Sequence, residues 1–145
     1  MPVHKHLLIR AEVDNPIVSE KELKKWLRKL VKIIDMEIVK GPYASYVNKV
    51  GNRGVTGVVM IETSHIAIHI WDEERPSLVQ CDVYSCAEFS ASEVLVHLNT
   101  MEPVKVDYLM LNRENGFYDT HNSCSMKKEV KRFLCLNPFI VQKNG

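Results

Sequence analysis

The chain has 145 residues, of which 46% are apolar and 26% charged, and its 19 basic and 18 acidic side chains give a net charge of +1. These values are typical of one globular domain over residues 1–145, and they exclude a disordered tail, a collagen-like repeat and a disulfide-dense miniprotein. The near-zero charge offers no field for nucleic acid or an acidic membrane, no apolar run is long enough to span a bilayer, and no signal peptide is recognisable, so we expect a cytoplasmic protein.

The first predicted element is a strand over Leu7 to Val13, where the residues are largely apolar and β-branched. Ser19 and Glu22 then form a capping box, and apolar residues follow at helical spacing from Leu23 to Ile34. The other predicted elements are strands over Met36 to Val39 (stopped by Gly41-Pro42 before a loop rich in Tyr, Asn and Gly), Val55 to Ile61, Ser64 to Trp71, Val79 to Ser85 and Val104 to Leu111, and helices over Ser92 to Met101 and Met126 to Cys135.

This order of elements predicts an α+β fold, in which helices pack on one face of an antiparallel sheet to give a two-layer sandwich. Two or three helices do not cover both faces of a sheet of six strands. We therefore expect the bare face to pair with a second copy of the chain, which gives a homodimer.

The four cysteines are Cys81, Cys86, Cys124 and Cys135, and in a cytoplasmic chain we expect them to be reduced. Cys81 and Cys86 are five residues apart, an odd offset that places them on opposite faces of a strand. We therefore expect neither a disulfide nor a shared zinc ion between them.

The strand over Ser64 to Trp71 alternates polar and apolar residues and carries two histidines on one face. His65 and His69 are four residues apart, which is about 13 Å along a strand and too far for a shared metal ion, so no metal site is expected. A Ser–His hydrolase is disfavoured because the chain has no G-x-S-x-G nucleophile elbow.

Three blocks in this region, which begin at Gly54, Thr63 and Asp82, carry glycine, serine, histidine, tryptophan and cysteine at distinctive spacings. They resemble the small bacterial and archaeal type of S-adenosylmethionine decarboxylase. That family carries the motifs G-V-S-G, E-S-H-x-x-I-H-T-W-P-E and D-[VIL]-F-T-C-G. In total the resemblance spans about Lys5 to Gly116, and it is weaker outside these three blocks.

The resemblance implies that the chain makes its own cofactor. Ser64 would attack the carbonyl of Thr63, and β-elimination would then cut the chain into residues 1–63 and 64–145 and leave a pyruvoyl group derived from Ser64. A hydroxyl nucleophile needs a base and a stabilised oxyanion. By resemblance, His69 is the processing histidine, and Thr56 stands where the family has a processing serine.

The resemblance also implies the chemistry of the mature enzyme. The pyruvoyl group would form a Schiff base with the small-molecule substrate and act as an electron sink during decarboxylation. Cys86 corresponds to the family's proton donor, while Trp71 and Glu73 correspond to residues near the substrate. The implied product is decarboxylated S-adenosylmethionine, the aminopropyl donor for spermidine and other polyamines.

The chain departs from the family pattern in and around these motifs. Thr63 replaces a glutamate, Ala87 replaces a glycine, and the aromatic residue before G-V-S-G has only Val50, Tyr43 or Tyr46 as counterparts. These changes leave two alternatives open: a pyruvoyl-dependent decarboxylase of a basic amino acid such as arginine or ornithine, and an uncleaved, non-catalytic homologue that regulates an active decarboxylase.

Overall fold

The computed structural model describes residues 3–114 of the chain. The expected helix over residues 126–135, together with Cys124 and Cys135, lies outside the described residues. The described elements are β1 (Lys5–Val13), α1 (Glu20–Ile33), β2 (Ile38–Val47), β3 (Gly54–Ile61), β4 (Ser64–Trp71), β5 (Ser77–Ser85), α2 (Ala91–Leu98), the 3-10 helix η1 (Asn99–Met101) and β6 (Pro103–Asn112).

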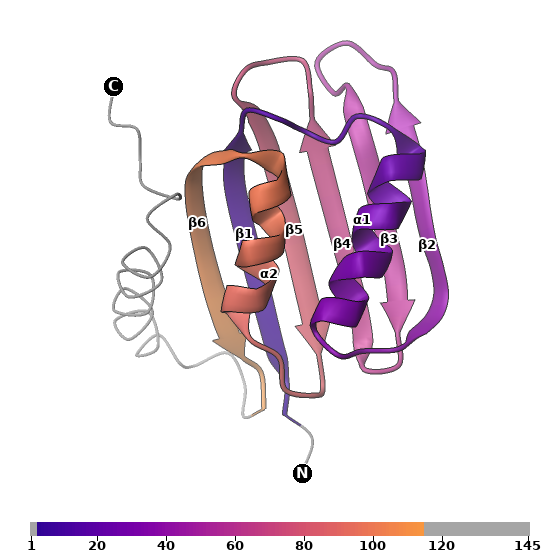
Figure 1. The fold of residues 1–145 in the computed structure, drawn as a ribbon, viewed down its shortest axis with the longest axis vertical. Coiled ribbons are helices and arrows are strands. Elements are labelled where there is room, and N and C mark those ends of the chain that lie inside the picture. The colour runs from indigo at the N-terminus through magenta and orange to yellow at the C-terminus, as the bar shows by residue number, and fades with distance from the viewer. Residues whose placement is uncertain (1–2, 115–145) are drawn as a thin grey trace.

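The six strands form one sheet in the order β2-β3-β4-β5-β1-β6, and every neighbouring pair is antiparallel. Both helices lie on the same face of this sheet (Figure 1). The predicted α+β architecture, an antiparallel sheet with helices on one face, is confirmed. The face opposite the helices is called the open face below.

The hydrophobic core lies between the sheet and the two helices. Ser19 caps α1 by accepting a hydrogen bond from the Glu22 N–H at 3.1 Å, as the capping box predicts. In the sheet, the apolar set of β4 packs inward, since Ile66, Ile68 and Ile70 are at most 1% exposed. The helices contribute the buried residues Leu23, Trp26, Leu27, Leu30, Val31, Val94, Leu95 and Leu98.

The two glycines of the block that begins at Gly54 are each required at their position, for different steric reasons. Gly54 has φ +155°, and a Cβ there would lie 1.8 Å from the carbonyl oxygen of Ile70 on β4. Gly57 lies under α1, where a Cβ would approach Leu23 to 2.7 Å and Leu27 to 3.0 Å. The first glycine therefore permits the pairing of β3 with β4, and the second permits α1 to pack closely on β3.

The expected end of the second strand at Gly41-Pro42 is wrong. β2 continues through both residues to Val47, with a register shift between Lys40 and Tyr43. Because β2 is an edge strand, a proline without an N–H interrupts no ladder on its outer side, and an irregular pairing absorbs the local distortion. The following loop is correspondingly shorter than expected.

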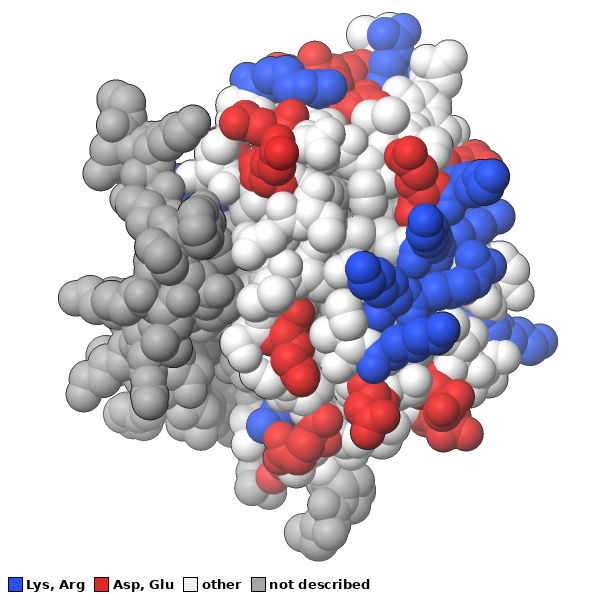
Figure 2. All heavy atoms as spheres, in the orientation of Figure 1, with Lys and Arg blue, Asp and Glu red and all other residues white. Residues whose placement is uncertain are grey.

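The outer surface of α1 is basic. Lys25, Arg28, Lys29 and Lys32 are exposed, and Figure 2 shows the resulting blue group on the helix-covered side of the molecule. This group lies on the face of the sheet opposite to the one that carries His65 and His69. Within residues 3–114, no helix is both long and apolar enough to cross a membrane.

Candidate active site

The Thr63–Ser64 peptide bond lies where the turn after β3 enters β4. Ser64 is the first residue of β4 and pairs in register with Ser85, the last residue of β5. The N–H of Cys86 donates a hydrogen bond to the Thr63 carbonyl oxygen at 2.9 Å. The structure therefore brings together three of the residues that the sequence singles out, Thr63, Ser64 and Cys86.

Ser64 has an unusual backbone conformation, with φ 148°. A non-glycine residue in this region is strained, at a cost on the order of 1–3 kcal/mol, and such strain occurs where the surrounding structure enforces it. The Thr63 side chain is held separately, because its hydroxyl donates to the Met36 sulfur at 3.1 Å. The β-branched side chain of Thr63 is thus fixed by a residue that follows α1.

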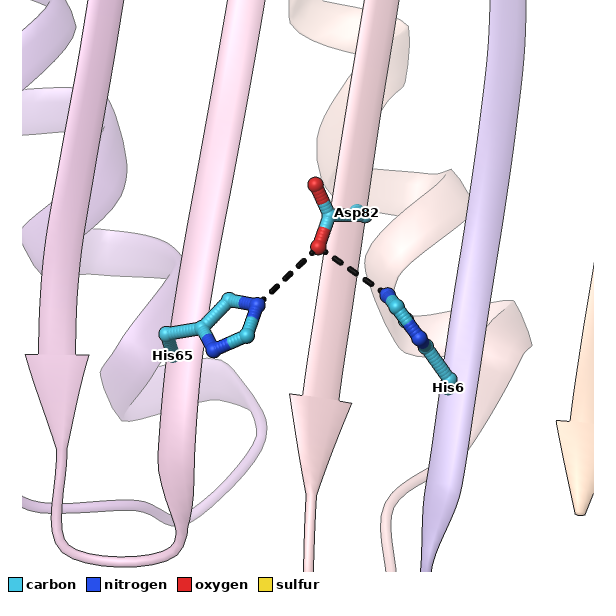
Figure 3. Close-up of side chains that lie close together, drawn as sticks. All are labelled: His6, His65 and Asp82. Carbon is cyan, nitrogen blue, oxygen red and sulfur yellow. Dashed lines mark hydrogen bonds and ion pairs between the residues drawn. The ribbon is translucent and has the colours of Figure 1, made fainter. Parts of the chain in front are cut away.

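A hydrogen-bonded group adjoins Ser64 on the open face. The Ser64 hydroxyl lies 3.3 Å from His65 Nδ1, and His65 Nε2 lies 3.2 Å from Asp82 Oδ1. His6 Nε2 lies 3.0 Å from the same Asp82 oxygen. Figure 3 shows the two imidazoles reaching this carboxylate from the strands on either side of it. We call His6, His65 and Asp82 the carboxylate–histidine group.

Sequence reasoning missed this group. Strand alternation could have placed His6, His65 and Asp82 on one face, since each shares its parity with other open-face residues of its strand. Their meeting also requires the order β4-β5-β1 and its register, in which both His6 and His65 are opposite Tyr84. Neither property can be read from local spacing.

The nitrogen and oxygen atoms of the carboxylate–histidine group all lie within 4.8 Å of one another, which is close enough to consider a metal ion. The surroundings of His6 favour hydrogen bonds instead. Arg113 Nη1 lies 3.3 Å from His6 Nδ1, and a guanidinium can only donate. His6 Nδ1 is then an acceptor, and its proton resides on Nε2, the nitrogen that a metal would need.

A second group of predicted residues lies at the other end of β4. The Thr56 hydroxyl is 2.9 Å from His69 Nδ1, and Trp71 stacks on the His69 ring with centroids 5.7 Å apart. Trp71 Nε1–H donates to Asn52 Oδ1 at 2.8 Å. Glu73 accepts from the Gly51 N–H at 2.9 Å. His69 is exposed on the open face, and these contacts fix the orientation of both rings.

The two groups are far apart within one chain. Thr56 and His69 pair in register five positions from the pair Ile61 and Ser64, which corresponds to about 16 Å along the strands. Trp71 is seven positions from Ser64, or about 23 Å. Ser64 and Cys86 therefore share one end of the sheet, while Thr56, His69, Trp71 and Glu73 share the other.

The open face between the two groups is hollowed. A cavity of about 460 Å³ is lined by His69, Asp82, Arg10, Asp107 and Tyr108, among others. At the Trp71 end, a second hollow is lined by Tyr46, Val50 and Glu73. Tyr46 and Val50 are two of the three candidates for the missing aromatic position. Tyr46 donates its hydroxyl proton to Asp72 at 2.9 Å, and this hydrogen bond raises the pKa of Tyr46.

The two described cysteines differ in environment. Cys81 is 4% exposed in the core, and burial raises the pKa of its thiol, whereas Cys86 is partly exposed after the end of β5. Cys81 follows the inward alternation of β5, whereas Cys86 lies one residue beyond the end of that strand, so their placement on opposite faces of one strand stays a prediction.

We expect iodoacetamide to modify Cys86 much faster than Cys81 in the folded protein. A raised pKa lowers the thiolate fraction of Cys81 at every pH, and the core also excludes the reagent. Peptide mass spectrometry of briefly treated protein separates these two sites from Cys124 and Cys135. Equal modification of Cys81 and Cys86 before unfolding would contradict the assigned environments.

Comparison with known proteins identifies the same family that the sequence motifs resemble. Residues 8–114 match the sequence profile of the S-adenosylmethionine decarboxylase family. A protein from Pyrococcus furiosus named S-adenosylmethionine decarboxylase proenzyme is 30% identical over 105 residues, covering 71% of this chain and 70% of that protein. A protein of the same name from Sulfurihydrogenibium is 32% identical over 74 residues, covering 48% of this chain and 53% of that protein.

A solved structure shares the fold. The crystal structure of the adenosylmethionine decarboxylase from Aquifex aeolicus superposes with a TM-score of 0.64 at 24% sequence identity, covering 82% of this chain and 95% of that one. The matched part of the chain spans about half to 70% of the length of the two curated relatives.

Proposed function

The chain belongs to the S-adenosylmethionine decarboxylase family, and we propose that it is a self-processing, pyruvoyl-dependent enzyme. It converts S-adenosylmethionine to decarboxylated S-adenosylmethionine and so supplies aminopropyl groups for spermidine and other polyamines. The proposed enzyme acts in the cytoplasm as a homodimer. The observation that carries the proposal is the contact between the Cys86 N–H and the carbonyl oxygen of Thr63 at 2.9 Å.

That contact is what an acyl shift at Thr63–Ser64 requires. When the Ser64 hydroxyl oxygen attacks the Thr63 carbonyl carbon, negative charge develops on the carbonyl oxygen. An N–H already directed at that oxygen stabilises the charge without reorganisation. The strained backbone of Ser64 adds to the driving force, because breaking the peptide bond releases the constraint. The residues present therefore fit the formation of a pyruvoyl group at position 64.

The mature site is built around the same end of the sheet. A pyruvoyl group supplies a carbonyl that bonds to the α-amino group of a substrate and withdraws electrons as carbon dioxide leaves. The substrate carbon then needs a proton, and a thiol is a suitable general acid. Cys86 is the proposed donor, since its backbone adjoins position 64 and its side chain is partly exposed.

The substrate-binding residues raise a geometric problem for a single chain. Trp71 and Glu73 are proposed to contact the adenosine part of the substrate, through stacking and hydrogen bonds to ribose. Trp71 lies about 23 Å along β4 from Ser64, a distance greater than the length of an extended S-adenosylmethionine molecule. The same problem separates His69 and Thr56 from the bond that they are proposed to help process.

A homodimer removes the problem. If two open faces pack against each other about a twofold axis that crosses the strands, the Ser64 end of one sheet meets the Trp71 end of the other. Each complete site then combines Ser64 and Cys86 of one chain with His69 of the partner subunit. The open face has apolar residues to bury, since Leu8, Val58 and Met60 are 38%, 39% and 50% exposed.

We expect mixed dimers to test this arrangement directly. A tagged His69→Ala chain should remain almost uncleaved alone, but should be cleaved when co-expressed with Ser64→Ala, because the mixed dimer contains one site with Ser64 and His69 both intact. Mass spectrometry of the tagged chain gives the readout, and light scattering at micromolar concentration gives the dimer mass. A monomer mass, or no cleavage of the tagged chain in mixed dimers, would contradict the shared site.

A further inference from the structure

The hydroxyl of Ser64 is the first member of a continuous hydrogen-bonded chain that runs through His65 to Asp82. We propose that His65 is the base that takes the proton from Ser64 during the acyl shift, and that Asp82 is the positioning residue that orients it. This inference rests on the proposed cleavage between Thr63 and Ser64, and it assigns a group to the first step of that cleavage.

The proton positions follow from the partners. A carboxylate only accepts hydrogen bonds, so His65 Nε2 must carry the proton that it directs at Asp82, 3.2 Å away. In a neutral imidazole the other nitrogen then has a free lone pair. That nitrogen, Nδ1, is the one that lies 3.3 Å from the Ser64 hydroxyl. A contact of this length shortens as the reacting groups approach one another.

Asp82 is itself held in place from the opposite side. His6 donates to the same oxygen at 3.0 Å, and Arg113 in turn contacts His6 at 3.3 Å. The Arg113 guanidinium lies 4.1 Å from the centroid of the Tyr84 ring, which also adjoins His65. The groups that face His65 are thus Ser64, Asp82, His6 and Tyr84, with apolar Met60 opposite it on β3. Asp82 and Tyr84 of β5, backed by His6 of β1, therefore orient the imidazole of His65.

The step balances without any outside reagent. The Ser64 hydroxyl proton passes to His65 Nδ1 while its oxygen bonds to the carbonyl carbon of Thr63. The Cys86 N–H holds the oxyanion. The bond from that carbon to the Ser64 nitrogen then breaks, and His65 returns the proton to the freed nitrogen. The product is an ester between Thr63 and Ser64 with a free amino group on Ser64.

This assignment separates the two histidines of β4. His65 adjoins Ser64 in its own chain, whereas His69 lies about 16 Å away along the strand and reaches a cleavage site only in the partner subunit. His65 therefore serves the acyl shift, and His69 remains available for the later elimination. The two steps are chemically distinguishable, because hydroxylamine cleaves the ester between Thr63 and Ser64 and leaves a peptide bond at that position intact.

The test follows loss of the full-length chain after cell-free synthesis, for wild type and three variants. We expect His65→Ala to be slowed roughly a hundredfold, the usual effect of losing a general base, and to be partly rescued by added imidazole. Hydroxylamine should not cleave it between residues 63 and 64, because no ester forms there. Asp82→Asn should be slowed roughly tenfold or more, since an amide can hold the wrong tautomer. His4→Gln, which alters a neighbouring histidine that contacts Tyr84, should process normally.

Three outcomes would overturn the inference. They are wild-type cleavage of His65→Ala, a hydroxylamine-sensitive ester in that variant, and a folded His65→Ala that imidazole fails to rescue while Asp82→Asn cleaves normally. An uncleaved wild-type chain would instead overturn the proposed function itself. Circular dichroism of each variant shows whether it is folded, and the Asp82→Asn result stands independently if His65→Ala does not fold.

Discussion

Ser64→Ala is expected to leave a single uncleaved chain of 145 residues, while the wild-type chain separates into fragments of 63 and 82 residues. The variant lacks the Ser64 hydroxyl oxygen that attacks the Thr63 carbonyl carbon, so no acyl shift can begin. The expected loss is complete, because the elimination needs the ester that this hydroxyl forms. Intact mass under denaturing conditions gives the readout.

Thr63→Ala is the matched control for this experiment. Thr63 supplies its carbonyl to the acyl shift, while its side chain contacts Met36. Removing the side chain keeps the carbonyl and its hydrogen bond from Cys86, so this variant should still be cleaved. The assignment of the cleavage site fails if wild type and Ser64→Ala have the same intact mass after long incubation.

Cys86→Ala is expected to cleave normally and then to decarboxylate poorly. The contact that supports cleavage comes from the backbone N–H of residue 86, which alanine retains. The thiol is needed only for protonation of the substrate carbon, and loss of a positioned general acid costs on the order of a hundredfold or more in rate. The measurement is release of labelled carbon dioxide, expressed per cleaved and folded chain.

Cys81→Ala controls for the general effect of losing a cysteine. Cys81 is buried on the helix side of β5, so its truncation should lower stability by about 1 kcal/mol and leave turnover per folded molecule unchanged. A role of Cys86 in packing alone would give the same pattern in both variants. Equal losses of activity after correction for the folded fraction therefore count against Cys86 as the proton donor.

The fold could be predicted well where a local pattern determines it. The capping box at Ser19, the apolar stripe of α1 and the alternation of β4 all reappear as predicted, because each depends on spacing within one element. The second strand was mispredicted at Gly41-Pro42, since local propensity does not reveal that β2 lies at the sheet edge. Position in the sheet decides whether a proline ends a strand.

The candidate site, like the fold, could be predicted from the sequence only in part. The resemblance supplied Ser64, His69, Cys86, Thr56, Trp71 and Glu73, but not their arrangement in space. Strand spacing already separates Ser64 from His69, and the structure adds that Thr56 is paired with His69 at the far end. The contacts of Ser64 with His65 and of Thr63 with Cys86 depend on one turn and on the pairing of β4 with β5. No motif spacing contains that information.

In the proposed enzyme, position 64 becomes the group that binds and decarboxylates S-adenosylmethionine. The most direct measurement is intact mass of the purified protein after incubation with S-adenosylmethionine and a borohydride reductant, with arginine and ornithine in parallel. We expect the fragment over residues 64–145 to gain the mass of the reduced substrate or product only with S-adenosylmethionine. A gain with arginine or ornithine instead, or a chain that stays whole and unmodified with all three, would contradict the proposal.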